Sequence, residues 1–160
     1  MDRDADRAVN TLYRLHYRSL VSLTVLLVGE VCTAEGIVQD SFVAMHSAWP
    51  RLAEGDRALP YLHQSVIRRS RSVLRRRIFA RLIAPGPPGA GPLAVSSPGD
   101  VSVLAALSAL PLRQREVLVL LYYAALREAE VASALRISEG SVRRHAEQAI
   151  SSLYGAIQHI

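Results

Sequence analysis

The feature that most constrains the fold is a segment near the middle of the chain that is rich in proline, glycine and serine. It reads APGPPGAGPLAVSSPGD from Ala84 to Asp100 and carries no charge before its final aspartate. Proline removes a backbone donor and glycine raises backbone entropy, so the segment favours neither helix nor strand. The sequence therefore predicts two blocks, residues 1–83 and 101–160, joined by a flexible linker at residues 84–100. A long surface loop within one domain is the alternative.

The first block has the apolar spacing of amphipathic helices and no convincing strand alternation. Val38, Phe42, Met45 and Trp49 recur at helical steps and should share one buried face, with Thr33 as the N-cap of their helix. We expect another helix in YLHQSVIRRSRSVLRRRIFARL. Its predicted buried stripe comprises Leu62, Val66, Val73, Leu74 and Ile78.

The second block predicts several shorter helices. They lie in VSVLAALSAL, in PLRQREVLVLLYYAA, in REAEVASAL and in the final stretch, with Pro111 suited to a first helical position. The predicted fold class is therefore all-α, with two small helical domains joined by a flexible linker.

The charge of the chain favours a polyanionic partner. The formal net charge is +5 at pH 7 and the sequence pI is about 10.0, although a solvated basic surface gives similar values. All 19 residues counted as lysine or arginine are arginine, which we attribute mainly to GC-rich coding bias. The abundance of guanidinium groups is therefore weak support for phosphate binding.

Many of these arginines lie on the helix predicted after Tyr61. No acidic residue occurs between Asp56 and Asp100, and like charges one turn apart repel each other. A counter-charge from nucleic acid, an acidic protein or an anionic membrane would relieve the repulsion; a solvated face is the alternative. The arginines are Arg68, Arg69, Arg71, Arg75, Arg76, Arg77 and Arg81.

The sequence offers little for catalysis, metal binding or disulfide formation. Cys32 is the lone cysteine, the five histidines show no HExxH spacing, and GPPGAGP lacks the lysine of a phosphate loop. We therefore expect no enzyme, no cofactor and no metal site. A lone cysteine also fits a reducing cytoplasm.

No segment is expected to insert into a membrane. The charged start MDRDADRAVNTLYR lacks the apolar run of a secretory signal. The most apolar segment, Leu20 to Val31, is about half as long as a bilayer span and contains Glu30, so it predicts a buried helix. We expect a cytoplasmic protein; membrane attachment through the basic helix is the alternative.

The stretch ALRISEGSVRRHAEQAI has the spacing of a helix-turn-helix. Two crossed helices need small and apolar residues at fixed offsets so that their backbones approach. Val131 and Leu135 are placed at the buried edge of the first helix and Ala132 at the crossing. Ile137 would fill the turn, and Val142 would anchor the second helix.

Two residues of the turn have specific requirements. Ser138 can accept a hydrogen bond from the free backbone N–H groups that open the second helix. Arg136 occupies a position usually given to glycine, so it must adopt a left-handed conformation at some cost or open the turn differently.

The second helix has one apolar and one polar side. The apolar side comprises Val142, Ala146, Ala149, Ile150 and Leu153. The polar side comprises Ser141, Arg144, His145 and Gln148. Arginine can take guanine bidentately, and the other three residue types offer shorter contacts to base edges in a major groove. Arg143 lies at the flank, where it could reach phosphate or pair with Glu147.

The order and spacing of these motifs resemble the small extracytoplasmic-function (ECF) sigma factors of bacterial RNA polymerase, which have only regions 2 and 4. LYRLHYRSLVSL resembles the family's first helix, AEGIVQDSF its polymerase-docking helix, and YLHQSVIRRSRSVLRRR its promoter-melting helix. The resemblance covers nearly everything from Leu12 to Leu153. It implies region 2 at residues 1–83 and a region 4 helix-turn-helix at residues 101–160.

The resemblance implies a sigma factor that binds core RNA polymerase and promoter DNA, with an anti-sigma factor as a candidate further partner. The residues implied for polymerase docking are Gln39, Asp40 and Val43. Those implied for the minus 10 element are Tyr61, Gln64, Arg68, Arg69, Arg71, Arg75 and Arg76. Those implied for the minus 35 element are Ser141, Arg143, Arg144, His145 and Gln148.

Three residues depart from the family pattern. Gly36 stands where the docking helix usually has an acidic residue, which costs about 1 kcal/mol of helix propensity. Arg68 stands where the melting helix commonly has asparagine. Arg127 stands where serine usually caps the first helix of the helix-turn-helix. These departures suggest a divergent member.

Two other functions also fit the sequence. One is a sigma-like adaptor that docks on polymerase without opening promoters. The other is a conventional dimeric helix-turn-helix repressor, although the chain lacks an obvious dimerisation heptad and the first block would be unexplained.

Overall fold

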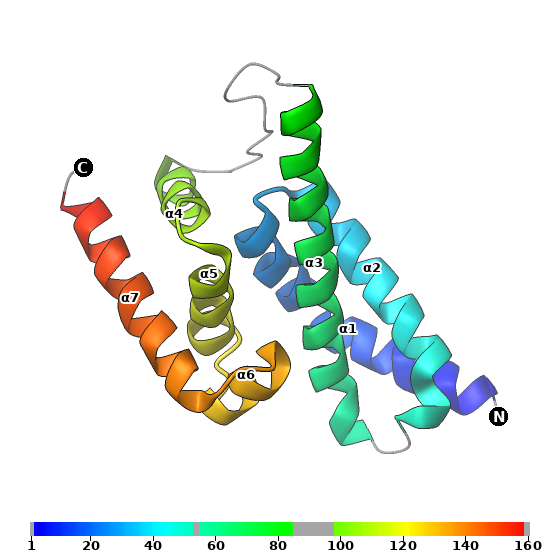
Figure 1. Ribbon diagram of the computed structural model, residues 1–160. Helices are drawn as coiled ribbons and strands as arrows, with labels where there is room; N and C mark the ends of the chain where they lie inside the picture. Colours follow the sequence, from blue (N-terminus) through cyan, green and yellow to red (C-terminus); the bar gives the residue numbers. More distant parts are fainter. Residues whose placement is uncertain (1, 53–54, 85–97, 159–160) are drawn as a thin grey trace. The chain divides into compact units, whose positions relative to one another are not determined.

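The computed structural model describes residues 2–52, 55–84 and 98–158 (Figure 1). Within these residues the chain forms helices and turns and no strand, so the predicted all-α class is confirmed. The chain divides into two compact units, Met1–Pro92 and Leu93–Ile160. Each unit has its own helices and core.

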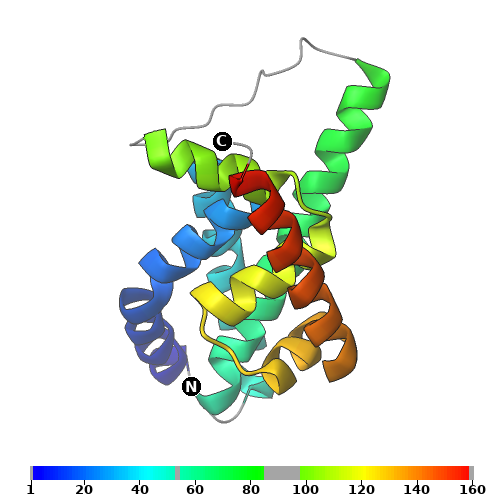
Figure 2. The ribbon, with the colours of Figure 1, turned by 90° about the vertical axis from the view of Figure 1, so that its left-hand side faces the viewer.

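The first unit consists of three long helices that pack side by side (Figures 1 and 2). They are α1 (Asp2–Val28), α2 (Val31–Ala48) and α3 (Ala58–Ile83), with short 3₁₀ turns at Trp49–Arg51 and Gly55–Arg57. All three helices contribute to the core. Its most deeply buried side chains include Leu20, Leu23, Val38, Met45, Leu62 and Val66.

The helix predicted in the apolar segment after Leu20 ends at Val28, directly before Gly29. This glycine has φ of +80°, and its N–H donates a hydrogen bond to the carbonyl of Val25 at 2.7 Å. A left-handed glycine directly after the last helical residue is a common way to end a helix. The chain therefore turns sharply there, and α2 begins two residues later.

The prediction that Thr33 caps α2 is wrong. The helix begins at Val31, its N-cap is Glu30, and Glu30 makes no side-chain capping bond. Thr33 lies inside the first turn, where its hydroxyl donates to Glu30 Oε2 at 2.7 Å. Trp49 also differs from the prediction, because it lies half-buried in the 3₁₀ turn after α2.

The buried stripe predicted on α3 covers only part of the helix. Leu62 and Val66 are fully buried and Val73 and Leu74 are half-buried, but Ile78 is 60% exposed. The C-terminal end of α3 extends beyond the turn between α1 and α2 in both views (Figures 1 and 2). No helix of the first unit covers it, so the prediction for Ile78 is wrong.

The second unit is built from shorter helices. They are α4 (Pro98–Ser108), α5 (Leu112–Leu118), the π-helical turn η3 (Val119–Tyr123), α6 (Glu128–Leu135) and α7 (Glu139–Ile157). Helix α7 packs against α5, α6 and α4. The buried core includes Leu104, Val117, Leu120, Val131 and Val142.

Two boundary predictions in the second unit need correction. Helix α4 begins at Pro98, so the last residues of the predicted linker are helical; residues 85–97 lie outside the described part of the chain. Pro111 is the N-cap of α5 rather than its first helical residue, since its ψ of 143° is extended.

Helices long and apolar enough to cross a bilayer are absent from residues 2–52, 55–84 and 98–158. The segment from Leu20 instead contributes Leu20, Leu23 and Leu27 to the core of the first unit.

Candidate nucleic-acid interface

Helices α6 and α7 form the helix-turn-helix that the sequence predicts. Val131, Leu135 and Val142 are buried where the helices meet, and Ala132 is only 8% exposed at the crossing. Because the two helices contact each other at small and apolar positions, α7 is held at a fixed angle to α6. The polar side of α7 is therefore presented by a packed scaffold.

The turn between the two helices is tight. Arg136 adopts the left-handed conformation, with φ of 57° and ψ of 47°, and ends α6. Ile137 is half-buried beside it, and its N–H donates to the carbonyl of Ala132 at 3.0 Å. Of the two options that the sequence left open, Arg136 takes the strained one, which allows the turn to stay short.

The predicted cap of α7 is present at Ser138. The backbone N–H of Ser141 donates to Ser138 Oγ at 3.1 Å, and the Ser138 hydroxyl donates to Ser141 Oγ at 2.9 Å. The first turn of α7 is thus fixed by two hydrogen bonds. Ser141, a predicted reading residue, is half-buried, and its hydroxyl oxygen accepts a hydrogen bond within the turn.

The remaining polar residues of α7 differ in their accessibility. Arg144 and Gln148 are exposed, whereas His145 is half-buried. On the apolar side Val142, Ala146 and Ala149 are buried, as predicted, and Leu153 is half-buried. Ile150 is 42% exposed, which corrects its prediction: it lies one residue beyond Ala149 and falls off the edge of the buried stripe.

The surroundings of His145 lower the pKa of its imidazole. Burial lowers its pKa below the usual 6.5, and the charges of Arg144 and Arg113 lower it further. Its Nδ1 is buried and makes no hydrogen bond. The lowered pKa favours the uncharged imidazole at neutral pH, in which one ring nitrogen can donate and the other can accept a hydrogen bond.

Arg143 is paired across the helix-turn-helix. Its Nη1 lies 2.9 Å from Glu128 Oε2 in the first turn of α6, and the pairing that the sequence suggested with Glu147 is not formed. Arg127 has no side-chain capping bond, as its identity predicted, and its Nε donates to Glu130 Oε1 at 2.7 Å.

Helix α5 contributes two residues that the sequence reasoning missed. Arg113 Nη1 lies 3.4 Å from Glu116 Oε2 and 3.4 Å from the carbonyl oxygen of Leu135. Gln114 Nε2 donates to Gln148 Oε1 at 3.4 Å. No local motif marks these residues, because the partners on the helix-turn-helix, Leu135 and Gln148, lie more than twenty positions away in the sequence.

In the first unit, α3 carries a second polar surface. Its predicted minus 10 residues Tyr61, Gln64, Arg68, Arg71 and Arg75 follow one another at steps of three and four, so they share one face. Gln64, Arg68 and Arg75 are exposed, and Tyr61 and Arg71 are half-buried. The face is therefore accessible along most of the helix.

The other two predicted minus 10 residues lie beside this face. Arg76 is exposed. Arg69 is half-buried, and its Nε donates to Ser65 Oγ at 3.2 Å, while the Ser65 hydroxyl donates to Ser41 Oγ at 3.0 Å. Buried serines on α3 and α2 thus anchor the guanidinium of Arg69.

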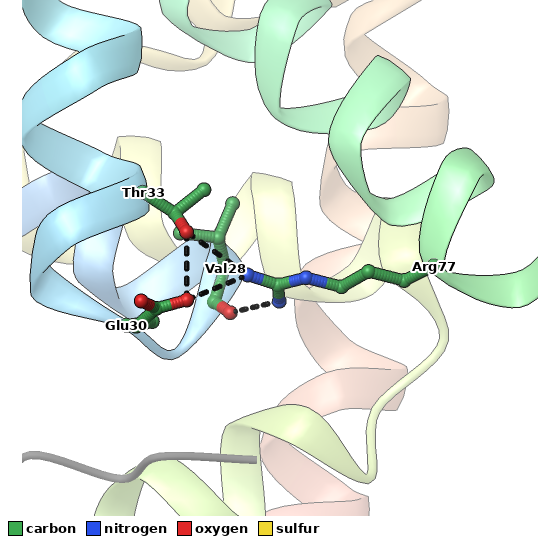
Figure 3. A network of polar contacts seen from close by, with 4 residues as sticks. All are labelled: Val28, Glu30, Thr33 and Arg77. Carbon is green, nitrogen blue, oxygen red and sulfur yellow. Dashed lines mark hydrogen bonds and ion pairs between the residues drawn. The ribbon is translucent and has the colours of Figure 1, made fainter. Parts of the chain in front are cut away.

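Arg77 points inward to the turn between α1 and α2 (Figure 3). Its Nη1 donates to the Val28 carbonyl at 2.6 Å, and its Nη2 lies 3.3 Å from Glu30 Oε2 and 3.4 Å from Thr33 Oγ1. Glu30 therefore neutralises one of the arginines for which the sequence suggested an outside counter-charge. The same contacts satisfy a carbonyl at the end of α1.

The predicted docking residues lie on the outer face of α2. Gln39 and Asp40 are exposed and Val43 is 67% exposed. Gln39 Nε2 donates to the hydroxyl oxygen of Tyr17 on α1 at 3.4 Å, and Tyr17 stacks on Tyr13 with ring centroids 4.6 Å apart. Tyr13 and Tyr17 of α1 thus support one edge of the surface formed by the docking residues.

Comparisons with known proteins match both the C-terminal domain and the whole fold. Residues 100–153 match the family model described as sigma-70, region 4. The structure of CnrH in complex with the cytosolic domain of CnrY has a TM-score of 0.77 and 23% identity, covering 99% of this chain and 95% of that one.

A second structure is the sigma factor RpoE from Bartonella quintana, in complex with the anti-sigma factor NepR. It has a TM-score of 0.75 and 17% identity, and the match covers 93% of this chain and 96% of that one. The search of curated proteins gives no match. These findings confirm the resemblance that the sequence motifs suggested.

Proposed function

We propose that this chain, a sigma factor by the family of its residues 100–153 and by its fold, binds core RNA polymerase and directs promoter-specific initiation of transcription. The observation that carries the proposal is the coincidence of the region 4 match with a helix-turn-helix whose second helix exposes Arg144 and Gln148. Sigma factors of this family act by binding rather than by catalysis.

Helix α7 would read the minus 35 element in the major groove. Arg144 is exposed and can contact guanine bidentately, whereas Ser141, His145 and Gln148 can offer single polar contacts. Arg143 lies at the flank and is held by Glu128, so its role would be to contact phosphate rather than to select a base.

Helix α3 would bind the minus 10 element and stabilise the opened strands. Its arginines can neutralise phosphate, and Tyr61 offers a ring on which an unstacked base can rest. These contacts lower the free energy of the open state without covalent chemistry. The face of α2 that carries Gln39, Asp40 and Val43 would dock on the polymerase. The factor would act in the cytoplasm.

An anti-sigma factor is a further expected partner. The sigma factor RpoE from Bartonella quintana was solved with the anti-sigma factor NepR, and CnrH with the cytosolic domain of CnrY. The similar fold of the present chain supports regulation by a protein of this kind.

The test is transcription by polymerase reconstituted with the purified chain, with transcript starts mapped by sequencing. We expect starts at a limited promoter set that core polymerase alone does not use. Arg144→Ala should cost about 1 to 3 kcal/mol of binding on the preferred upstream sequence and less on unrelated sequences. Binding to core polymerase without any promoter-dependent transcript would instead identify an adaptor.

A further inference from the structure

The reading face of α7 contains one side chain whose orientation is set by another helix. Gln148 is exposed on α7, and Gln114 is half-buried on α5, which packs directly against α7. Gln114 Nε2 donates to Gln148 Oε1 at 3.4 Å. The carbonyl oxygen of Gln148 is therefore directed toward α5.

The burial of Gln114 favours this direction of the hydrogen bond. Its Oε1 is buried and has no hydrogen-bond partner. If the amide were rotated, its NH₂ group would occupy that buried position and two donors would lack partners instead of one acceptor. Because each unsatisfied buried polar group costs free energy, the observed orientation, with the NH₂ directed to Gln148, is the less costly one.

We propose that Gln114 is a specificity-determining residue that limits which base Gln148 can read. By holding the Gln148 carbonyl toward α5, it leaves only the NH₂ group of Gln148 for a base edge. Gln148 then selects a base whose major-groove edge presents acceptors and no donor, which are guanine and thymine, over adenine, whose N7 acceptor lies beside the N6 donor, and over cytosine. This inference rests on the proposed function, because it assumes that α7 enters a major groove.

The chemistry of the base edges gives the direction of the preference. A glutamine that reads adenine bidentately needs its oxygen and its nitrogen side by side, to accept from N6 and donate to N7. Cytosine presents a donor at N4, which also needs the oxygen. Guanine presents N7 and O6 and thymine presents O4, and the NH₂ group of Gln148 can donate to each of these atoms.

The experiment selects promoters from a library in which the upstream element is randomised, using polymerase reconstituted with the full-length chain. The proteins compared are the wild type, Gln148→Ala, Gln114→Met and Gln114→Glu. Gln148→Ala identifies the base pair that Gln148 reads, as the position whose preference it abolishes. Gln114→Met keeps the length of the side chain and removes its donor, which frees the Gln148 carbonyl.

Gln114→Glu serves as the reversing variant. A carboxylate accepts a hydrogen bond from the Gln148 NH₂ group and turns the Gln148 carbonyl outward. A merely structural role for Gln114 would weaken binding to every sequence equally, and would leave the ranking of the four bases unchanged. The ranking is therefore the readout, and thermal unfolding of each variant checks that it is folded.

For the wild type we expect guanine or thymine at the identified position. Gln114→Met and Gln114→Glu should enrich adenine there by about fivefold or more, the lower limit for one good bidentate contact. The proposal is overturned by adenine in the wild type, by an unchanged ranking in both folded variants, or by no effect of Gln148→Ala at any position. In these cases promoter selection by the wild type would still support the proposed function; no selection at all would overturn both.

Discussion

At the scale of single residues, two glycines near the start of α2 differ in whether their backbone conformation requires glycine. Gly29 has φ of +80°, which a side chain tolerates poorly, whereas Gly36 is an exposed helical residue where an added Cβ would meet no atom within 4 Å. Glycine inside a helix costs about 1 kcal/mol relative to alanine. The glycine at position 36 is therefore a local weakness that no packing constraint explains.

We expect Gly36→Ala to raise the free energy of unfolding of the first unit by up to about 1 kcal/mol. Gly29→Ala is the matched control and should lower it by about 1 to 2 kcal/mol, because alanine must take up the left-handed conformation. Urea unfolding followed by circular dichroism measures both. A loss of stability in Gly36→Ala would show that the residue has a role beyond helix propensity.

The lowered pKa of His145 sets the sign that we expect for its contribution to the pH dependence of stability in the second unit. Its folded pKa lies below the usual value of 6.5 because of burial, then Arg144, then Arg113. As the pH falls below 6.5, His145 binds a proton in the unfolded chain before it does so in the folded chain. The stability linked to the neutral His145 is therefore present above pH 6.5 and is lost as the pH falls through the folded pKa.

Thermal unfolding between about pH 7.5 and about pH 5 tests this sign. The midpoint of the wild type should fall more steeply with decreasing pH than that of His145→Gln, which has no titrating ring. Parallel curves for the two proteins would contradict the lowered pKa.

At the scale of elements, Arg77 joins three helices at one point. It bonds to the carbonyl of Val28 at the end of α1 and to Glu30 and Thr33 at the start of α2, from a position on α3 (Figure 3). Because side chains at this corner are only partly exposed, the charged hydrogen bonds there are less screened than those on an open surface.

We expect Arg77→Met to lower the free energy of unfolding by about 1 to 2 kcal/mol, since it leaves the Val28 carbonyl and the Glu30 carboxylate without this partner. Arg76→Met is the control, because Arg76 is exposed one position earlier, and should change stability by less than about 0.5 kcal/mol. Equal changes in the free energy of unfolding for the two variants, measured by chemical denaturation, would contradict a stabilising role of the Arg77 contacts.

Local sequence patterns predict contacts between residues that lie close together in the chain. The burial of Val131, Leu135 and Val142 is predictable because a helix-turn-helix brings neighbours in sequence into contact. Arg77 pairs with Glu30 over 47 positions and Gln114 with Gln148 over 34. Periodicity identifies the face of a helix but not the residue opposite it, so neither pair could be predicted.

The same limit explains the errors at helix ends. The apolar spacing on α3 continues to Ile78, but the length of the neighbouring helices decides whether that residue is covered, and it is not. Thr33 has the chemistry of an N-cap, yet Gly29 ends α1 early enough for α2 to begin before it.

At the scale of the whole molecule, the proposed function divides the basic residues into two classes. Arg75 and Arg76 are exposed on α3 and available to phosphate, whereas Arg77 is engaged within the first unit. Binding that neutralises phosphate releases counterions, so its salt dependence counts the contacts. Replacing arginines of the two classes should therefore have different effects on the salt dependence of promoter binding.

Replacing Arg75 and Arg76 together by alanine should reduce the slope of log affinity against log salt by about 2 for the reconstituted polymerase on its promoter. Arg77→Met should leave the slope unchanged even where it lowers the amount of folded protein. Filter binding at several salt concentrations measures both. An unchanged slope in the double variant would assign this face of α3 to another partner.

The corner held by Arg77 also has a genetic consequence. Position 28 contributes a main-chain oxygen, which every amino acid possesses, so exchanging the valine leaves that acceptor in place, whereas any replacement of the arginine removes the donor. A random mutagenesis screen for heat-sensitive alleles should therefore recover codon 77 with many different replacements, and codon 28 only with those that disturb the neighbouring apolar packing.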